Sequence, residues 1–375
     1  MTEYKEEFKT KYKTRQVRIG DLVIGGGMPV TIQSMTNVDS RDERALLKQI
    51  SELTEAGCEI VRIAVPDMEA AEAFGRVKQK LVQSGNRVPL VADIHFDYRL
   101  AIAAIKAGAD KIRINPGNIG SYDRVRAVVT AAREREIPIR VGVNSGSLEK
   151  NILEKYGGVT AEGLAESALA NLKIIQDTDY NNLVVSIKSS DVRMNYEAHK
   201  LLAARTDCPV HIGITEAGTL ARGKVKSAVG IGALLLEGIG DTMRVSLTAN
   251  PVEEAIFARE ILRSIGLRKP AVDLISCPTC GRTKIDLQKL ASHMEARLPE
   301  LEEKLAATGG PSIRVAVMGC AVNGPGEARE ADFGVAGGDG RGVIFAKGEI
   351  LMTNVPEDEI TDRLINIIEE RICGK

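Results

Sequence analysis

The sequence predicts an α/β fold in two parts, a (β/α)8 TIM barrel followed by a small α+β domain. From about residue 28 to 265, short runs rich in Val and Ile alternate with segments of helical periodicity. After residue 265 this alternation stops, and segment 266–273, with Gly, Arg, Lys and Pro, is typical of a linker. We therefore expect the barrel in residues 1–265 and the second domain in residues 266–375.

Eight apolar runs are candidate barrel strands: 30–34, 60–65, 90–94, 111–115, 139–143, 183–188, 210–215 and 243–247. Helices are expected between them, among them 41–56, 67–82, 122–135, 161–176 and 216–236. This strand count favours a closed parallel barrel over an open doubly wound sheet, which remains the structural alternative. Residues 17–24, with Gly20-Asp21 at the centre, predict a hairpin that closes the bottom of the barrel.

The second domain shows a different order of elements. We expect strands at 274–276 and 313–318 on either side of a long charged helix at 285–306. A glycine-rich loop, a hairpin around 337–342 and a terminal helix at 357–371 follow. This order predicts a small α+β domain.

Composition excludes several classes of protein. The 375 residues are 44% hydrophobic and 27% charged, which is ordinary globular composition. The balance of 50 basic and 51 acidic residues argues against a nucleic-acid or membrane-surface partner. Segment 1–15 has no apolar stretch that could act as a signal or anchor, and segment 229–239 is too short to span a bilayer. We expect a cytoplasmic protein.

Three cysteines of the second domain form the strongest chemical motif. Cys277-Pro-Thr-Cys280 places two thiolates on one turn, and Cys320 follows a strand and precedes a Gly-Pro-Gly loop. Such a set can hold three corners of an iron–sulfur cluster, and the flanking glycines let backbone N–H groups approach the sulfurs. Six cysteines are too few for a disulfide scaffold in a chain of this length.

Two other interpretations of the cysteine motif stay open. A thioredoxin-like dithiol would explain Cys277 and Cys280 but leaves Cys320 without a role. A structural zinc site could take His293 as its fourth ligand, although His293 lies inside an expected helix. We expect Cys58, Cys208 and Cys373 to be inert.

Polar residues gather where the expected barrel strands end, which is where barrel enzymes place their active sites. They are Arg62, Asp93, His95, Arg113, Asn115, Arg140, Asn144, Lys188, Glu216, Arg244 and Ser246. A single Arg in such a place could form an ordinary salt bridge. Converging cations are costly to desolvate unless an anion meets them, and guanidinium groups suit phosphate oxygens. The set therefore predicts a phosphate-bearing substrate.

Nucleotide cofactor motifs are weak in this sequence. The glycines of segment 229–234 loosely resemble a dinucleotide loop, but they lie in an expected helix and follow no strand. The sequence contains no P-loop. Electrons for a cluster must then come from another protein.

The motifs Ser276-Cys-Pro-Thr-Cys-Gly281, Cys320-Ala-Val-Asn-Gly-Pro-Gly-Glu327 and Arg113-Ile-Asn-Pro-Gly-Asn118 carry a family resemblance. Together they resemble the 4-hydroxy-3-methylbut-2-en-1-yl diphosphate synthases of the methylerythritol phosphate isoprenoid pathway. The resemblance covers essentially the whole chain and indicates the short bacterial form, in which the barrel joins the cluster domain directly.

The resemblance implies a [4Fe-4S] cluster held by Cys277, Cys280, Cys320 and Glu327. It implies reductive opening of 2-C-methyl-D-erythritol 2,4-cyclodiphosphate, with flavodoxin or ferredoxin as the electron donor. Catalytic roles fall to Glu327 and, as proton-handling groups, to Glu216 and Asp93, while His95 either orients Asp93 or simply packs. The implied diphosphate-binding set is Arg62, Arg113, Asn115, Arg140, Asn144, Lys188, Arg244 and Ser246.

Two competing functions remain at this stage. A barrel methyltransferase with an accessory cluster would bind a pterin or corrinoid at the mouth. An iron–sulfur electron carrier or redox sensor would leave the charged mouth without a role.

The linker also bears on assembly. Extended, residues 266–273 span roughly 28 Å, which leaves nothing spare for passing around the outer helices to the mouth of the same barrel. We therefore expect a head-to-tail homodimer in which each cluster domain completes the partner's active site.

Overall fold

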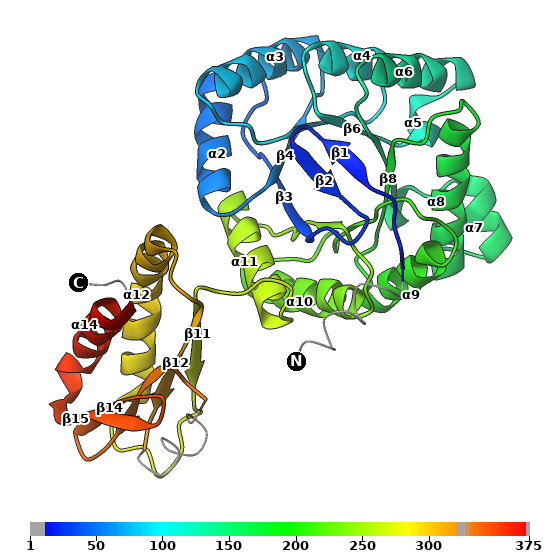
Figure 1. Ribbon diagram of the computed structural model, residues 1–375. Helices are drawn as coiled ribbons and strands as arrows, with labels where there is room; N and C mark the ends of the chain where they lie inside the picture. The colour runs from blue at the N-terminus through cyan, green and yellow to red at the C-terminus, as the bar shows by residue number, and fades with distance from the viewer. Residues whose placement is uncertain (1–11, 321–327, 329, 373–375) are drawn as a thin grey trace. The chain divides into compact units, whose positions relative to one another are not determined.

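The computed structural model describes residues 12–320, 328 and 330–372 (Figure 1). Its contacts divide the chain into two compact units, the first ending at Arg268 and the second beginning at Lys269. The division falls inside the segment that the sequence predicts to be a linker. Each unit has its own hydrophobic core.

The first unit is a barrel of eight parallel strands, in the order β8-β7-β6-β5-β4-β3-β10-β9, and a bridge between Val185 and Val210 closes the ring. This confirms the predicted TIM barrel. The strands are β3 (Thr31–Met35), β4 (Ile60–Ala64), β5 (Leu90–Asp93), β6 (Lys111–Ile114), β7 (Ile139–Asn144), β8 (Leu183–Lys188), β9 (His211–Ile212) and β10 (Thr242–Met243).

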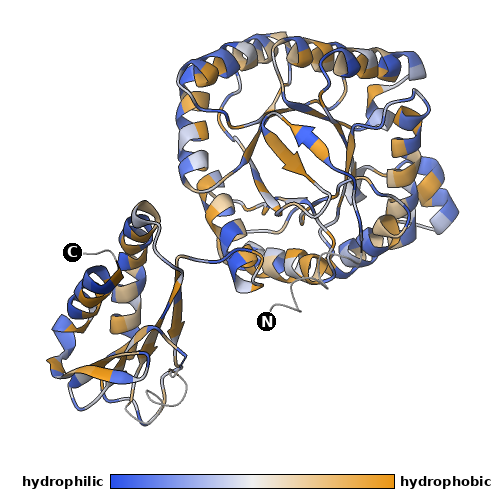
Figure 2. Ribbon diagram, in the orientation of Figure 1, coloured by the Kyte–Doolittle hydropathy of each residue, from blue (hydrophilic) through white to orange (hydrophobic). Residues whose placement is uncertain are grey.

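Helices surround the strands (Figure 1), with apolar residues gathered on the sides that face the ring (Figure 2). Side-chain caps explain where many of them start: Asp42, Asp67 and Asp191 each accept a hydrogen bond from a backbone N–H three residues on. The helices are α2 (Glu43–Glu55), α3 (Met68–Gln83), α4 (Tyr98–Lys106), α5 (Pro116–Ile119), α6 (Tyr122–Glu134), α7 (Lys150–Tyr156), α8 (Ala161–Gln176), α9 (Val192–Ala203), α10 (Leu220–Leu236) and α11 (Pro251–Ser264).

Strands β9 and β10 are shorter than the runs expected at 210–215 and 243–247. Beyond the paired residues the chain keeps isolated bonds, from Arg244 N–H to the Ile212 carbonyl at 3.0 Å and from Thr215 N–H to the Ser189 carbonyl at 3.3 Å. Each expected run is thus longer than the paired strand, because its last residues lie beyond the regular pairing, where the strand passes into a loop.

The glycine-rich segment 229–234 lies inside α10, as expected, and forms no dinucleotide loop. One of its glycines, Gly230, has a packing role, because a Cβ there would lie 2.6 Å from Cδ1 of Ile214. Within the described ranges, no helix combines the length and the apolar character needed to cross a membrane.

The predicted hairpin is present as β1 (Val17–Ile19) and β2 (Leu22–Ile24), and Figure 1 shows it lying across the centre of the ring. Its Val17, Ile19 and Ile24 are buried against the inward-facing side chains of three barrel strands, Ile60, Val91 and Val184. This apolar contact closes the bottom of the barrel, the end at which the strands begin.

The second unit is a five-stranded sheet in the order β11-β12-β13-β14-β15, with β11, β12 and β13 parallel and the remaining pairs antiparallel. Its elements are β11 (Val272–Ser276), α12 (Leu287–Thr308), β12 (Ile313–Met318), β13 (Phe333–Gly337), β14 (Arg341–Ala346), β15 (Glu349–Pro356) and α14 (Ile360–Ile372). Strand β15 was not predicted. It is a largely exposed edge strand, so it lacks the apolar alternation that marks a half-buried strand.

Candidate functional site

Inward-facing side chains of the barrel stack in layers of four, each layer supplied by alternate strands. The strand registers define five such layers, numbered here from the bottom to the mouth. The first layer is Ile60, Lys111, Val184 and Thr242, and the second is Gln33, Val91, Arg140 and His211. The third or middle layer is Arg62, Arg113, Ser186 and Arg244, the fourth is Met35, Asp93, Gly142 and Gly213, and the fifth is Ala64, Asn115, Lys188 and Ser246. Six of the cations and amides predicted from the sequence therefore share one cavity wall. Most barrels fill these layers with branched apolar residues, so the polar interior here needs a functional explanation.

Three arginines form the middle layer around one carboxylate. Asp93 lies 3.9 Å from Nε of Arg62 and 3.4 Å from Nη1 of Arg113, and all three side chains are buried. Nε2 of His95 approaches the same carboxylate to 3.3 Å from the exposed side. Of the two alternatives that the sequence leaves open for His95, orienting Asp93 or simply packing, this contact is compatible with the first.

The surrounding cations set the charge of Asp93. Burial by itself would raise the pKa of this carboxyl, but Arg62, the bond from His95, Arg113 and Arg140 together hold it well below its usual range. Burial lowers the pKa of Arg62 to about 10, which still leaves the guanidinium charged at neutral pH. Asp93 is therefore an ionised counter-ion in the substrate-free barrel.

Glu254, at the first turn of α11, was missed by sequence reasoning. Its buried carboxylate accepts bonds from Nε of Arg244 at 3.1 Å, from the backbone N–H of Leu247 at 3.0 Å and from the hydroxyl of Ser34 at 3.0 Å. It holds Arg244 and the following loop in one position. The signal in the sequence was a Glu three residues after the Pro that begins a helix, and acidic residues in the first turn are equally typical of ordinary helices.

Met35 was also missed. Its Sδ lies 3.1 Å from Nε of Arg62 and 3.7 Å from Nη1 of Arg244. A thioether is a weak acceptor that carries no charge. It can therefore separate two guanidinium groups without neutralising either of them.

Glycines leave room for two of the cations. A Cβ on Gly142 would lie 2.8 Å from Nε of Arg113, and a Cβ on Gly213 would lie 3.2 Å from Nζ of Lys188. Burial is the main reason that the pKa of Lys188 falls well below its usual value, and Arg62 is the next largest cause. Both cations thus occupy space that the side chain of any residue other than glycine would fill at these two positions.

The loops at the mouth carry the remaining predicted residues. Asn115 is buried, and its side-chain oxygen accepts a hydrogen bond from the Gly117 N–H. Asn115 thereby caps the N-terminus of α5 and fixes the loop after β6. Asn144 ends β7 and Ser246 follows β10, both half-buried. Exposed Glu216 has a φ of 50°, a conformation that is strained for a residue with a side chain and recurs at functional sites.

In the second unit, two of the expected cluster ligands follow neighbouring parallel strands. Ser276, the last residue of β11, pairs with Val317 of β12, so Cys277 and Cys320 leave the same edge of the sheet. The Gly319 N–H donates to Sγ of Cys277 at 3.2 Å. A backbone N–H directed at a thiol sulfur is a usual feature of iron–sulfur sites.

Cys280 is exposed, and hydrogen bonds led by the backbone N–H of Arg282 lower the pKa of its thiol. Such a thiol ionises readily and is suited to metal binding. Glu327 lies outside the described residues, and among the residues that are described no three His, Cys, Asp or Glu side chains lie close enough together to hold a metal ion. The donor chemistry of the three cysteines nevertheless fits an iron–sulfur cluster.

The cysteines expected to be inert differ from these. Burial raises the pKa of the Cys58 thiol to about 12, and it also raises the pKa of Cys208. Both thiols hold their protons at neutral pH. Cys373 lies outside the described residues.

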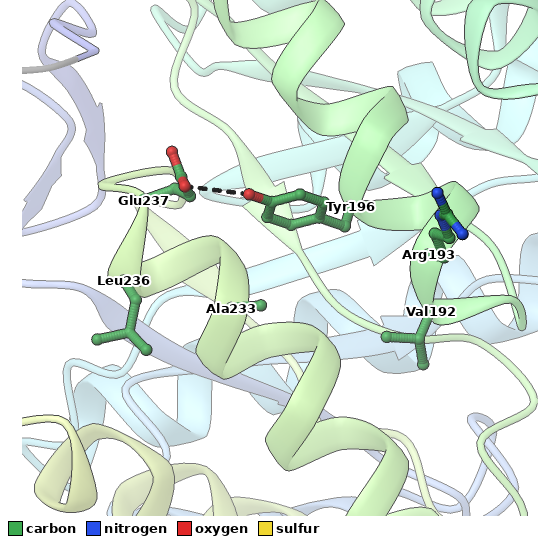
Figure 3. A pocket seen from close by; sticks show the side chains of 6 residues that line it. All are labelled: Val192, Arg193, Tyr196, Ala233, Leu236 and Glu237. Atoms are coloured by element: carbon green, nitrogen blue, oxygen red, sulfur yellow. Dashed lines mark hydrogen bonds between the residues drawn. The ribbon is translucent and has the colours of Figure 1, made fainter.

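A shallow hollow of about 510 Å³ lies on the outer surface, between α9 and α10 (Figure 3). Val192, Ala233 and Leu236 supply apolar walls, and the Tyr196 hydroxyl donates to Glu237 at 3.0 Å. The side chains drawn in Figure 3 bring no set of convergent charges, in contrast to the barrel mouth. We therefore place the candidate active site at the mouth.

Two solved structures resemble about two thirds of this chain. The chain resembles a type I 3-dehydroquinate dehydratase from Clostridium difficile, with 14% identity, a TM-score of 0.50, and coverage of 68% of this chain and 97% of that one. It equally resembles a 7,8-dihydropteroate synthase from Vibrio fischeri, with 12% identity, a TM-score of 0.50, and coverage of 68% and 99%. At this identity the likeness shows the fold and nothing of the chemistry.

Sequence relatives are much closer. Proteins named 4-hydroxy-3-methylbut-2-en-1-yl diphosphate synthase (flavodoxin) match from Ruminiclostridium cellulolyticum, with 51% identity over 97% of this chain and 99% of the relative, and from Clostridium perfringens, with 54% identity over 95% and 98%. A third, from Geobacillus kaustophilus, is 54% identical over 96% of this chain and 92% of its own length.

Family models cover both units. The GcpE TIM-barrel domain matches residues 14–259, and the GcpE protein C-terminal domain matches residues 273–370. With its polar barrel interior, its three cysteines at the end of a second sheet and matches over both units, the chain belongs to the GcpE family.

Proposed function

We propose that this chain is a 4-hydroxy-3-methylbut-2-en-1-yl diphosphate synthase, an oxidoreductase of isoprenoid precursor biosynthesis that reductively opens 2-C-methyl-D-erythritol 2,4-cyclodiphosphate. The observation that carries the proposal is full-length identity above 50% to relatives of that name. The geometry agrees with it, because the barrel interior offers arginines to a diphosphate and the second unit offers thiolates to a cluster.

The diphosphate is bound by the upper layers of the barrel. Arg62, Arg113 and Arg244 meet in one layer, and Lys188 with Ser246 and Asn115 lies above them toward the mouth. Arg140 approaches from the layer below, and Asn144 comes from the loop after β7. Among the described residues, six basic side chains line the barrel interior: Arg62, Lys111, Arg113, Arg140, Lys188 and Arg244. They face the two carboxylates Asp93 and Glu254. An anionic substrate therefore reduces an existing imbalance of charge.

Ring opening with loss of water consumes two electrons and two protons. As the bond from carbon to the phosphate oxygen breaks, negative charge grows on the departing phosphate, and the arginine layer stabilises it. The substrate dianion also offsets the cations that lower the pKa of Asp93, so binding raises that pKa and lets Asp93 hold a proton. Glu216, in its strained loop at the mouth, is the second proton-handling group.

A [4Fe-4S] cluster bound by Cys277, Cys280, Cys320 and Glu327 would supply the electrons to the substrate. A carboxylate is a harder and more labile ligand than a thiolate, so Glu327 would be the most readily exchanged ligand of the set. Flavodoxin, which is part of the relatives' names, is the electron donor that we propose, with ferredoxin as the other candidate.

The way in which the chain leaves the barrel supports a further part of the proposal, a homodimer with composite active sites. Nη2 of Arg268 donates to the Val30 carbonyl at 3.0 Å and to Glu59 at 2.6 Å, and both partners precede strands at the bottom of the barrel. From Arg268 only nine residues lead to Cys277, a reach of roughly 30 Å when fully extended. A route around the outer helices to the same barrel's mouth is longer, whereas a second copy can present its mouth directly.

The decisive experiment uses full-length protein, prepared and loaded with iron and sulfide without air. Incubation with the cyclodiphosphate and reduced flavodoxin should yield 4-hydroxy-3-methylbut-2-en-1-yl diphosphate. Absence of product from protein that carries a full cluster would refute the proposal. Glu327→Ala should keep its iron and turn over poorly, whereas Cys320→Ala should lose the cluster; normal activity in either would remove that residue from the ligand set.

A further inference from the structure

The lowest two layers of the barrel contain polar atoms that have no partner in the fold, and of their side chains the proposed reaction uses only Arg140. Nζ of Lys111, both amide atoms of Gln33, Nε and Nη1 of Arg140 and Nε2 of His211 are buried and have no hydrogen-bond partner among the described residues. These four side chains are at most 1% exposed. A buried polar atom without a partner costs on the order of 1–3 kcal/mol, so several together call for a ligand.

These atoms belong to one place. Lys111 lies in the bottom layer, and Gln33, Arg140 and His211 occupy three of the four positions in the layer directly above. His211 interacts electrostatically with Arg140 and Lys111, and Lys111 interacts with Arg140. The group is therefore a cluster, which we call the floor cluster, and not a set of scattered defects.

The floor cluster contains two side chains that are ordinarily cationic, Lys111 and Arg140. Burial, then Arg140, then Arg62 hold the pKa of Lys111 well below its usual value. Asp93 lies two layers above Arg140 and is engaged by Arg62, Arg113 and His95. Arg140 also interacts with Asp93, whereas no described carboxylate acts on Lys111. A charged Lys111 in this interior therefore needs a counter-charge.

Most of the cluster's atoms are donors. Lys111 and Arg140 donate only, and the amide nitrogen of Gln33 donates as well. The Thr242 hydroxyl lies 2.8 Å from Nδ1 of His211, and in the tautomer to which this hydroxyl donates, Nε2 carries the proton. The remaining positions in these two layers that face the hairpin are filled by Ile60, Val91 and Val184, so an ion at the cluster is bounded by apolar side chains on that side.

We propose that the floor cluster is a second anion-binding site, below the diphosphate site and sharing only Arg140 with it, that holds a small monovalent inorganic anion such as chloride. The ion accepts bonds from Lys111, Arg140 and Gln33. It keeps Lys111 charged and holds the Arg140 guanidinium beneath the arginine layer. This assignment does not depend on the reaction that the protein catalyses.

The direct test is crystallographic. Crystals of the full-length protein grown with the cyclodiphosphate occupying the mouth are soaked in bromide, and an anomalous difference map is calculated. We expect a peak within hydrogen-bonding reach of Nζ of Lys111 and Nε of Arg140. Water density alone at the floor cluster, without an anomalous peak, would refute the proposal.

A solution test uses Lys111→Met, which removes the ammonium and keeps the length of the side chain. The midpoint of thermal unfolding of the parent should rise with chloride concentration when gluconate holds the ionic strength constant, because an ion that binds the folded state stabilises it. Lys111→Met should lose this rise, and Lys106→Met, an exposed lysine of α4, should keep it. An equal response in parent and Lys111→Met would overturn the assignment; should Lys111→Met fail to fold, Lys111→Gln or the bromide map decides.

Discussion

At the scale of single residues, Glu254 shows how one buried carboxylate can organise a cationic site without neutralising it. It is 3% exposed, and besides Arg244 it engages a backbone N–H of the following loop and a hydroxyl from β3. Removing one partner of a buried pair leaves the other charge unsatisfied, which costs far more than an exposed salt bridge contributes.

We predict that Glu254→Gln lowers the free energy of unfolding by about 3 kcal/mol and raises KM for the cyclodiphosphate by about tenfold or more, because Arg244 loses its anchor. The neighbouring Glu253, whose carboxylate contacts Lys224 at 3.3 Å in a partly exposed pair, provides the matched control. Glu253→Gln should change stability by less than about 1 kcal/mol. Urea unfolding and steady-state kinetics measure both effects, and equal effects of the two substitutions would refute the anchoring role.

His199 on α9 makes stability depend on pH. Burial lowers its pKa to about 4, against about 6.5 in an unfolded chain. Between these values the unfolded chain binds a proton that the folded protein does not, so stability is complete above about pH 6.5 and falls as pH drops toward 4.

The free energy of unfolding of the parent protein falls between about pH 7 and about pH 5. We predict that His199→Gln makes this fall smaller by up to about 1.4 kcal/mol per pH unit, which is the effect of one proton. Buried His211, whose pKa also lies well below its usual value, continues to contribute to the slope. Exposed His293 serves as the control, and His293→Gln should leave the pH slope unchanged. An unaltered slope in His199→Gln would show that the imidazole titrates normally in the folded state.

At the scale of elements, neighbouring strands are matched so that one leaves space for the other's cation. Strand β7 carries a glycine where β6 sends Arg113 across the interior, since a Cβ on Gly142 would lie 2.8 Å from Nε and 3.1 Å from Nη2 of that arginine. The position of the guanidinium is thus decided by a residue that carries no charge and makes no hydrogen bond through a side chain.

Gly142→Ala should therefore raise KM by about tenfold, because the added methyl displaces Arg113, while the absorption spectrum of the cluster stays unchanged. Gly146, in the loop after β7, has no atom within 4 Å of its potential Cβ, so Gly146→Ala is a control of the same chemistry. Normal kinetics in Gly142→Ala would mean that Arg113 can take another position without loss of binding.

At the scale of the whole molecule, the two units carry different halves of the chemistry. The barrel offers cations and carboxylates, and the second unit offers thiolates. A bond network that includes Arg268 fixes the chain's exit at the bottom of the barrel, opposite the mouth. The reaction needs both units, and in the proposed homodimer a short connection between them is sufficient because each cluster unit acts at the partner's barrel.

Mixing two inactive variants tests the composite site. Glu216→Gln damages the barrel mouth and Cys320→Ala damages the cluster unit, so a mixed dimer contains one site in which both halves are intact. We expect activity to return to a substantial fraction after subunit exchange, whereas either variant alone stays inactive. Confirmed exchange without regained activity would show that each chain uses its own cluster.

The sequence by itself determined the fold class, most element positions and the residue types of the site. The barrel, the hairpin at its bottom and the helix over residues 161–176 were predictable because the periodicities of strands and helices depend on local patterns of apolar residues. Arg62, Arg113, Arg140 and Lys188 were found because cations inside apolar strands are unusual whatever the fold. The cysteine motif was found because Cys277 and Cys280 lie close together in the sequence and because glycines flank Cys320.

Only the tertiary structure decided which side chains share a layer and which partner each cation has. The stagger of a closed barrel brings Lys111, Gln33 and His211 together from strands far apart in the chain, and each of them alone looks like an ordinary strand residue. Glu254 reaches Arg244 from a helix start, and Gly142 matters only because β6 lies beside it. Contacts of this kind depend on the register between strands, which a single sequence does not specify.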